Sequence, residues 1–246
     1  MSTSSDTADP TAARAIVAVC TLNEAANIVA LVQGLRHSMP AVDVLVVDDD
    51  SPDGTAKLVE GMAVDDPRIK AEVRTTERGL GSAIRFAMAH AIEGEYDFFL
   101  NLDGDFSHDP AQMPVLLNRA QQETAVDVVI GSRYTAGGQI VGWPIHRKIM
   151  SRLVNGFATM CLRLPVKDCS GSMRCYRVSA LREMGMNNVR VQGYAVLEEV
   201  LVQLHRRGSA MAEVPITFTE RQQGQSKLTF REAIRSMLQI VSLAFK

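Results

Sequence analysis

The 246-residue chain has few cysteines and no long apolar run. Cys20, Cys161, Cys169 and Cys175 are irregularly spaced and form no Cys-x-x-Cys pair. This spacing argues against a disulfide framework or a zinc site and predicts reduced, mostly buried thiols. No uncharged apolar run approaches the roughly 20 residues that a membrane-spanning helix needs. The sequence therefore predicts a protein that does not cross a membrane by itself.

The N-terminus also lacks the basic start and apolar middle of a signal peptide. Its first residues are rich in Ser, Thr, Ala and Asp, so we predict a disordered tail over residues 1–13 and a single domain over residues 14–246. This start indicates a cytosolic protein.

Charge is distributed unevenly, although the net charge is only −2. Residues 1–127 carry a net −12 and residues 128–246 a net +10. An acidic half suits a metal ion, whereas a basic half suits phosphates or anionic lipid. No nucleic-acid partner is predicted.

Apolar, β-rich runs alternate with stretches of helical periodicity along the chain. The runs cover residues 15–20, 42–48, 69–74, 97–102 and 126–131, with a late strand at 211–218. The main helices are expected at residues 24–37, 55–62, 80–91, 111–121, 146–162, 193–207 and 229–245. This order predicts an α/β fold with one mostly parallel, Rossmann-like sheet flanked by helices on both faces.

Polar and acidic residues follow three of these strands. The first strand is followed by Thr21, Leu22, Asn23 and Glu24, the second by the run from Asp48 to Thr55, and the fourth by Asp103, Gly104 and Asp105. The carboxyl ends of parallel strands meet at one edge, so these side chains should converge. An isolated Asp-x-Asp is a weak signal, because a solvated turn with helix-capping carboxylates has the same pattern and is about twice as common. Carboxylates crowded from three strands indicate a compensating cation, such as Mg²⁺ or Mn²⁺ on a nucleotide diphosphate.

Seven segments carry a resemblance to a known family. They are residues 21–24, VVDDDSPDGT (46–55), LNLDGDFSHDP (100–110), GSR (131–133), DCSGSMRCYR (168–177), EVPITF (213–218) and RQQGQSKL (221–228). The chain resembles glycosyltransferase family two, with its GT-A fold, and within it the dolichol- and polyprenol-phosphate mannose synthases. The likeness begins near residue 14 and covers nearly the whole chain.

The resemblance implies transfer of mannose from GDP-mannose to polyprenyl phosphate with inversion. It implies metal binding by Asp103 and Asp105, and a catalytic set of Asp105, Arg133, Arg221 and Lys227. Nucleotide-sugar contacts are implied for Thr21, Leu22, Asn23, Glu24, Asp49, Asp50, Asp103, Gly104 and Asp105. The acceptor phosphate is assigned to Arg133, Arg174, Arg221 and Lys227. The alternatives are a polyprenyl-phosphate glucosyltransferase using UDP-glucose and a non-catalytic nucleotide-sugar-binding homologue.

Some positions allow a plainer interpretation or depart from the family pattern. Asp48 is equally well a ligand contact or a brace for its loop, and Arg174 is functional or part of an ion pair. Ser172 stands where a Gly is usual, and Ser107 where a Gln sometimes supplies a third metal contact. His108 is interpreted as a loop residue rather than a ligand.

No catalytic base is expected, because a phosphate monoester acceptor is already anionic at neutral pH. Catalysis then reduces to positioning and charge stabilisation. The absence of a Ser-His-Asp or Cys-His set agrees with this interpretation.

Residues 128–167 contain six basic residues and no Asp or Glu, and they include the only tryptophan, Trp143. Apolar residues recur there at helical spacing, at Ile145, Ile149, Leu153, Phe157 and Met160. This pattern predicts an amphipathic helix over residues 143–164 at an anionic membrane surface, although periodicity alone fits a helix packed on the sheet equally well. A second interface helix is expected over residues 229–246, on lipid or on an integral membrane partner. We therefore expect a peripheral protein at the cytoplasmic face of the membrane.

Overall fold

A computed structural model describes residues 13–191, 193, 195–221 and 238–244. Its main sheet has seven strands in the order β3-β2-β1-β4-β7-β5-β8, and β7 alone is antiparallel to its neighbours. The strands are β1 (Ala15–Thr21), β2 (Asp43–Asp48), β3 (Ile69–Val73), β4 (Phe98–Asp103), β5 (Val128–Ser132), β7 (Arg174–Arg177) and β8 (Met211–Pro215). The predicted mostly parallel α/β fold is confirmed.

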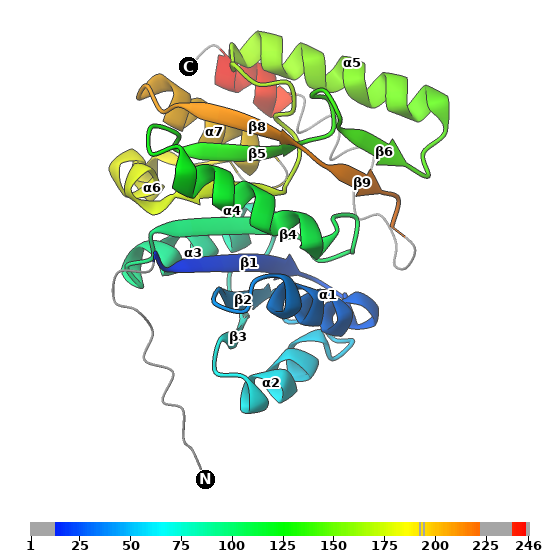
Figure 1. The fold of residues 1–246 in the computed structure, drawn as a ribbon, viewed down its shortest axis with the longest axis vertical. Coiled ribbons are helices and arrows are strands. Elements are labelled where there is room, and N and C mark those ends of the chain that lie inside the picture. Colours follow the sequence, from blue (N-terminus) through cyan, green and yellow to red (C-terminus); the bar gives the residue numbers. More distant parts are fainter. Residues whose placement is uncertain (1–12, 192, 194, 222–237, 245–246) are drawn as a thin grey trace.

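Helices cover both faces of this sheet (Figure 1). They are α1 (Ala25–Ser38), α2 (Thr55–Asp65), α3 (Leu80–Glu93), α4 (Met113–Gln122), α5 (Ile145–Leu162), α6 (Val178–Met184) and α7 (Val196–Arg206). Short 3₁₀ turns cover Pro110–Gln112 and Met186–Asn188, and residues 238–244 are helical. The expected helices that fall on described residues are present, with ends shifted by a few residues, whereas α6 was not predicted.

The late strand expected at residues 211–218 is two strands in different sheets. β8 belongs to the main sheet, whereas β9 (Thr217–Thr219) pairs with β6 (Gln139–Val141) in a two-stranded sheet. Ile216 lies at the crossing: its N–H donates to the carbonyl of Ser132 (3.1 Å), and its carbonyl accepts from the N–H of Gln139 (2.9 Å). The chain therefore passes from one sheet to the other without leaving these backbone groups unpaired.

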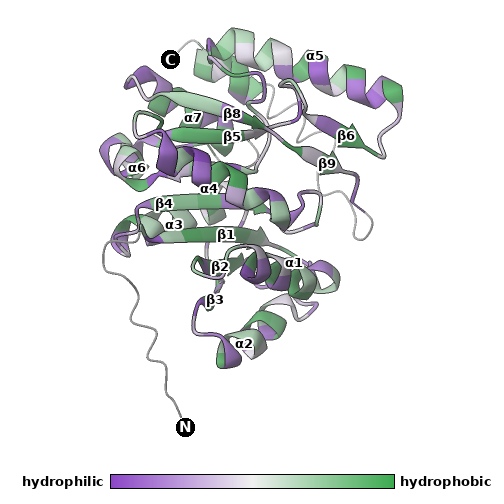
Figure 2. Ribbon diagram, in the orientation of Figure 1, coloured by the Kyte–Doolittle hydropathy of each residue, from purple (hydrophilic) through white to green (hydrophobic). Residues whose placement is uncertain are grey.

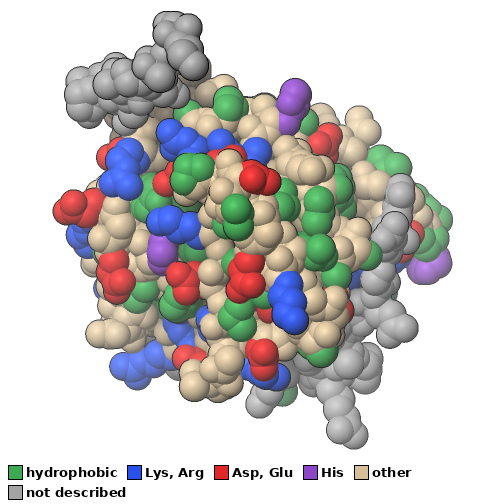
Figure 3. Space-filling model, turned by 90° about the horizontal axis from the view of Figure 1, so that it is seen from below, with side chains coloured by type: hydrophobic (Ala, Val, Ile, Leu, Met, Phe, Trp, Pro, Cys, Tyr) green, Lys and Arg blue, Asp and Glu red, His purple; other side chains and the backbone are tan. Residues whose placement is uncertain are grey.

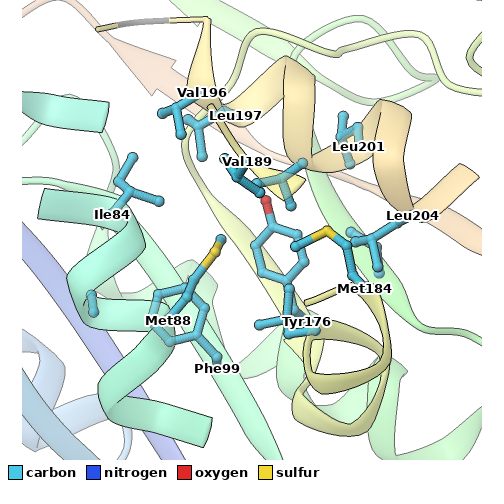
Figure 4. Packing of buried hydrophobic residues seen from close by; sticks show 14 of the residues in the cluster. Ile84, Met88, Phe99, Tyr176, Met184, Val189, Val196, Leu197, Leu201 and Leu204 are labelled. Carbon is cyan, nitrogen blue, oxygen red and sulfur yellow. The ribbon is translucent and has the colours of Figure 1, made fainter. Parts of the chain in front are cut away.

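Two buried apolar layers enclose the sheet. One joins α1, α2 and α4 to one face, and the other joins α3, α6 and α7 to the opposite face. The second layer packs around Phe99 and Tyr176, whose rings lie 6.0 Å apart, with Ile84 and Met88 of α3 beside them (Figure 4). The strands are accordingly hydrophobic along most of their length (Figure 2). Burial on both faces accounts for the continuous apolar runs in the sequence.

The two ends of the molecule differ. Helix α2 lies at one end of the longest axis and α5 at the other (Figure 1). On the face near α2, acidic, basic and hydrophobic side chains are interspersed (Figure 3). Three predictions fall wholly or partly on residues outside the described part: residues 1–12 of the expected tail over 1–13, Lys227, and residues 229–237 and 245–246 of the expected C-terminal helix.

Candidate active site

The acidic segments meet at one edge of the sheet, as the sequence predicts. Strands β2, β1 and β4 are parallel neighbours, and their register places Thr21 beside Asp48 and Cys20 beside Asp103. The loops that follow these strands therefore share one edge. Ligands of open parallel sheets bind at such an edge.

Asp48 braces the loop after β2. Its carboxylate is fully buried and accepts hydrogen bonds from the hydroxyl of Thr21 (2.8 Å), the N–H of Ser51 (2.7 Å) and the hydroxyl of Ser51 (2.6 Å). These three bonds compensate the buried charge. Of the two interpretations left open for Asp48, the structure supports the brace, because its oxygens already face these donors.

The loops after β1 and β2 are tied together by side chains of the second loop. The N–H groups of Asn23, Glu24 and Ala25 donate to Ser51, Thr55 and Asp53, respectively, over 2.9–3.0 Å. Thr21 is buried, as is Glu24, whereas Leu22 is exposed.

Gly104 allows the loop after β4 to approach these residues. A Cβ at that position would lie 3.1 Å from Cγ2 of Thr21 and 3.4 Å from Cγ of Glu24. The first of these distances is shorter than ordinary van der Waals contact, so a side chain at position 104 would push the loops apart.

Arg74 is a site residue that the sequence analysis missed. It follows β3 at the same edge, is buried, and donates to the Asp49 carboxylate through Nε (2.9 Å) and Nη2. The N–H of Gly79 donates to the other Asp49 oxygen over 2.6 Å. The expected strand at residues 69–74 ended on this arginine, and the argument used for the other strand ends applies to it equally.

Asp50 is more open than Asp49. It has a left-handed backbone with φ of 57°, it is half exposed, and it forms an ion pair with the exposed Arg78. The crowded carboxylates of the second strand end are therefore compensated largely by the chain's own hydrogen bonds and arginines. Of the acidic residues at these strand ends, Asp103 and Asp105 are therefore the ones that we expect to bind a cation.

Asp103 and Asp105 have different surroundings. Asp105 is buried, accepts from the N–H of Ser107 (3.0 Å) and pairs with Arg221 at 2.8 Å. The Asp103 side chain is 41% exposed and lies 4.0 Å from Nδ1 of the buried His108. Although the Asp103 side chain is partly exposed, the loss of hydration around it and the nearby Asp105 carboxylate raise its pKa. Burial lowers the pKa of His108, so its ring is neutral at physiological pH.

These two carboxylates fit a divalent cation. Among the described residues, no group of three His, Cys, Asp or Glu side chains is arranged to hold a metal ion. Two carboxylates together with phosphate oxygens form the hard-oxygen ligand set that Mg²⁺ and Mn²⁺ prefer. A cation there would also favour the ionised form of Asp103, whose pKa is raised without one.

Arg133, predicted to bind the acceptor phosphate, has a largely buried side chain that already has partners within the protein. Its guanidinium makes two 2.8 Å hydrogen bonds to the fully buried Asp168 and one to Ser170, and only 8% of its side chain is exposed. Burial raises the pKa of Asp168, but the hydrogen bonds from Arg133 outweigh this effect and hold it below its ordinary value. Asp168 was part of a matched segment, yet nothing in the sequence paired it with Arg133.

Arg174 is in a different environment from either predicted one. It is fully buried and donates to the carbonyls of Gly171 (2.8 Å), Leu197 (2.7 Å) and Cys169, and to the hydroxyl of Tyr176 (3.1 Å). It is therefore neither a surface ion pair nor open to an acceptor phosphate. Its guanidinium instead joins the backbone of residues 169–171 to that of Leu197 in α7.

Glu198 of α7 is a buried acid near this arginine. Burial raises its pKa from 4.5 to about 7, although the charge of Arg174 opposes the shift, and its Oε2 has no hydrogen-bond partner among the described residues. Because the folded-state pKa is the higher one, the folded protein binds this proton more tightly than the unfolded chain. The stability contributed by protonated Glu198 is therefore fully present below about pH 4.5 and is lost as the pH rises through about 7.

We expect Glu198→Gln to remove this pH dependence. The free energy of unfolding of the variant should exceed that of the unsubstituted protein by about 3 kcal/mol at pH 8, and the gain should vanish near pH 4.5. Urea unfolding at both pH values measures this difference. The exposed Glu183→Gln is the control and should change stability by less than about 0.5 kcal/mol at either pH. An equal effect of Glu198→Gln at both pH values would contradict the prediction.

Helix α5 exposes its apolar residues. Only Asn155, Ala158 and Leu162 of this helix are buried. Large hydrophobic side chains on its outer surface are 40–71% exposed, at Ile145, Ile149, Met150, Leu153, Val154, Phe157 and Met160. Figure 2 shows hydrophobic and hydrophilic positions alternating along this helix. A helix packed on the sheet through its apolar stripe would bury these side chains instead.

Trp143 connects the start of α5 to the site. The Arg147 guanidinium stacks on its ring at 4.0 Å, and the ring also packs against Phe218 of β9, with centroids 5.4 Å apart. Phe218 in turn contacts His108 at 5.1 Å. Among the helices that the structure describes, none combines the length and hydropathy that spanning a bilayer requires.

Comparison with known proteins identifies the family. Residues 16–185 match the model of glycosyl transferase family 2. The undecaprenyl-phosphate mannosyltransferase of Micrococcus luteus is 36% identical over 216 residues, 88% of each chain. The polyprenol monophosphomannose synthase of Mycolicibacterium smegmatis is 34% identical over 225 residues, which cover 90% of this chain and 84% of the relative.

Solved structures share the fold at lower identity. A glucosyl-3-phosphoglycerate synthase from Mycobacterium tuberculosis, in complex with Mn²⁺, UDP and glucosyl-3-phosphoglycerate, has a TM-score of 0.65 at 16% identity, over 94% of this chain and 78% of its own. A mannosyltransferase from Pyrobaculum calidifontis, in complex with GDP-Man and Mn²⁺, has a TM-score of 0.61 at 17% identity, over 96% and 64%. With the family model matching residues 16–185 and two relatives above 30% identity over most of its length, the chain belongs to glycosyltransferase family 2.

Proposed function

We propose that this protein transfers a mannosyl group from GDP-mannose to a polyprenyl phosphate, with inversion at the anomeric carbon. The observation that carries the proposal is the 34–36% identity, over about 90% of the chain, to an undecaprenyl-phosphate mannosyltransferase and a polyprenol monophosphomannose synthase. The convergence of the acidic strand ends at one edge supports it, because a nucleotide diphosphate with its metal binds at such an edge.

The chemistry requires positioned charges rather than a base. A phosphate monoester oxygen is already a nucleophile at neutral pH, so the protein has to hold it in line with the anomeric carbon. A divalent cation, when bound by Asp103 and Asp105, would neutralise the leaving diphosphate. The chain's own task is then to hold donor and acceptor phosphates close together despite their repulsion.

We assign the acceptor phosphate to Arg221 and Lys227. Arg221 lies beside Asp105, and 32% of its side chain is exposed, so it can reach an incoming anion. Lys227 lies outside the described residues, and its assignment rests on the match of RQQGQSKL to the family pattern. Arg133 and Arg174 support the site from below, because both are buried among bonds to other groups.

Asp49, Arg74 and the loop of Thr21 to Glu24 form the proposed nucleoside site. The Asp49 carboxylate is fixed by Arg74 and Gly79 at the edge next to β1. Asp50 lies at the more open side of this group, paired with Arg78. A base held here would place its diphosphate toward Asp103 and Asp105, two strands away in the same sheet.

We also propose that α5 binds an anionic membrane from the cytoplasmic side. An integral membrane partner, expected from the sequence at residues 229–246, would bind the protein at the same membrane. A polyprenyl acceptor resides in lipid, so the enzyme must reach the bilayer surface. Exposed apolar side chains interleaved with Arg147, Lys148 and Arg152 match a helix that lies in a lipid interface. Trp143 and Phe218 link this surface to His108 beside the acidic residues.

Replacing Arg147, Lys148 and Arg152 with Glu is expected to release the protein from anionic liposomes. Each basic side chain near such a surface contributes about 1 kcal/mol, and salt screens it, so binding of the unsubstituted protein should fall as ionic strength rises. Flotation with vesicles containing phosphatidylglycerol measures the bound fraction. The same change at the exposed Lys57, Lys70 and Arg182, on other elements, is the matched control and should retain binding. Undiminished flotation of the α5 variant would exclude this surface.

The transferase proposal is tested with membranes and a panel of labelled nucleotide sugars. GDP-mannose should yield a labelled product that extracts into organic solvent, and UDP-glucose should not. Label from UDP-glucose would instead identify a polyprenyl-phosphate glucosyltransferase. Binding of nucleotide sugar with no lipid product would support the non-catalytic alternative.

A further inference from the structure

Unpaired polar atoms gather around Asp103. Among the described residues, five buried side-chain nitrogen or oxygen atoms lack a hydrogen-bond partner. Four of them belong to Asn101, His108 and Ser172: one amide oxygen, both ring nitrogens and one hydroxyl. The fifth belongs to Glu198, a residue of helix α7. Each unpaired buried group costs about 1–3 kcal/mol, so their concentration in one place requires an explanation.

Several contacts hold these three residues together. Asn101 precedes Asp103 by two positions on β4, so both side chains lie on the same face of the sheet, and its amide nitrogen donates to the carbonyl of Ser172. His108 lies 4.0 Å from the Asp103 carboxylate.

The position of His108 is fixed by β9. Its backbone forms an isolated β-bridge with Phe218, and its ring packs edge-on against the Phe218 ring with centroids 5.1 Å apart. Only 1% of the residue is exposed. The packing holds the ring in place through its carbon atoms and leaves both nitrogens without a partner in the described chain.

The chemistry of this group selects its ligand. An amide oxygen, a hydroxyl and an imidazole ring offer hydrogen-bond donors and acceptors, and the group contains no guanidinium or ammonium side chain. Phosphate groups bind preferentially to arginine, lysine and metal ions, which are stronger partners for a dianion. Sugar hydroxyls, which both donate and accept, match an uncharged set of this kind. Asp103, the proposed metal ligand of the diphosphate, lies within the group, and the hexose is attached to that diphosphate.

We propose that Asn101, His108 and Ser172 bind hydroxyl groups of the donor hexose, and that His108 is the main determinant of affinity for the sugar. The assignment rests on the proposed use of a nucleotide sugar and goes beyond it by separating the sugar contacts from the nucleotide contacts. His108, interpreted from the sequence as a loop residue, becomes a substrate-binding residue. Ser172 has the same role, in a position where the family pattern has glycine.

Calorimetric binding of GDP-mannose and of GDP, both with Mn²⁺, separates these contacts. His108→Phe keeps a ring against Phe218 and removes both nitrogens. We expect it to weaken GDP-mannose binding about tenfold, as loss of one or two net hydrogen bonds implies, and to change GDP binding by less than about twofold. Ser172→Ala should weaken GDP-mannose binding about threefold with GDP unchanged. His108→Gln, which restores a donor and an acceptor, should recover part of the affinity.

His90→Phe is the matched control, because His90 contacts a phenylalanine, Phe86, on α3 and belongs to none of the proposed contacts. Both ligands should bind it as they bind the unsubstituted protein. Equal weakening of GDP and GDP-mannose by His108→Phe, or no weakening of either, overturns the assignment. Unsubstituted protein that fails to bind GDP-mannose would instead contradict the proposed function. Thermal unfolding of each variant confirms that it is folded at the temperature of the measurement.

Discussion

Asp105→Asn is expected to reduce mannosyl transfer at least about a hundredfold while leaving the protein folded. Asp105 is one of two carboxylates proposed to hold the cation on the leaving diphosphate, and its neutral isostere cannot offset that charge. The same change removes the negative charge that pairs with Arg221 at 2.8 Å. Initial rates of lipid-product formation at saturating Mg²⁺ or Mn²⁺ measure the effect, and calorimetry should show weakened metal-dependent donor binding.

The matched control is Asp109→Asn, four positions along the same loop. Asp109 accepts from the N–H of Ala111 over 2.9 Å at the start of a 3₁₀ turn, and asparagine can make the same bond. Its activity should stay within about twofold of the unsubstituted protein. Chelation of the metal should reproduce the Asp105 effect and be reversed by added Mn²⁺. Full activity in excess chelator would rule out a metal role for Asp103 and Asp105.

Arg133→Met is expected to lower the free energy of unfolding by about 3–5 kcal/mol. The substitution leaves the Asp168 carboxylate fully buried without its charged partner and the two 2.8 Å hydrogen bonds from it, so that only the N–H groups of residue 133 and Gly171 still donate to it. Urea unfolding followed by circular dichroism measures the change. Because Arg133 was also predicted to bind the acceptor phosphate, transfer should be assayed at a temperature where the variant remains folded.

Two further variants distinguish the effect of leaving one partner of a buried ion pair unpaired from the effect of simply removing a positive charge. Adding Asp168→Asn to Arg133→Met should recover part of the stability, since no unpaired charge then remains buried. Arg68→Met removes a partly exposed partner of Asp43, at 3.0 Å, and should cost less than about 1 kcal/mol. A loss of under 1 kcal/mol for Arg133→Met would show that the Asp168 carboxylate is compensated in another way. Unchanged stability with a large loss of transfer would return Arg133 to the acceptor site.

Local patterns were sufficient to predict the fold class and the location of the site. Alternating strands and helices require a covered, mostly parallel sheet, and the carboxyl ends of such strands meet at one edge. The ends of the first, second and fourth strands could therefore be placed together from the sequence, and the structure confirms that Thr21 pairs in register with Asp48 and Cys20 with Asp103. The antiparallel β7 was not predicted, because strand direction depends on which neighbour pairs with it.

The sequence by itself determined the fold class and which residues are available to the site: an α/β fold, acidic residues at three strand ends, and a basic segment around Trp143. The tertiary structure decided how each charge is used, because pairs such as Asp49 with Arg74 and Arg133 with Asp168 lie 25 and 35 residues apart. It also decided which face of α5 meets the rest of the protein, since helical periodicity is the same for a buried stripe and an exposed one. Burial and partner choice are properties of packing between distant segments, and a local pattern does not contain them.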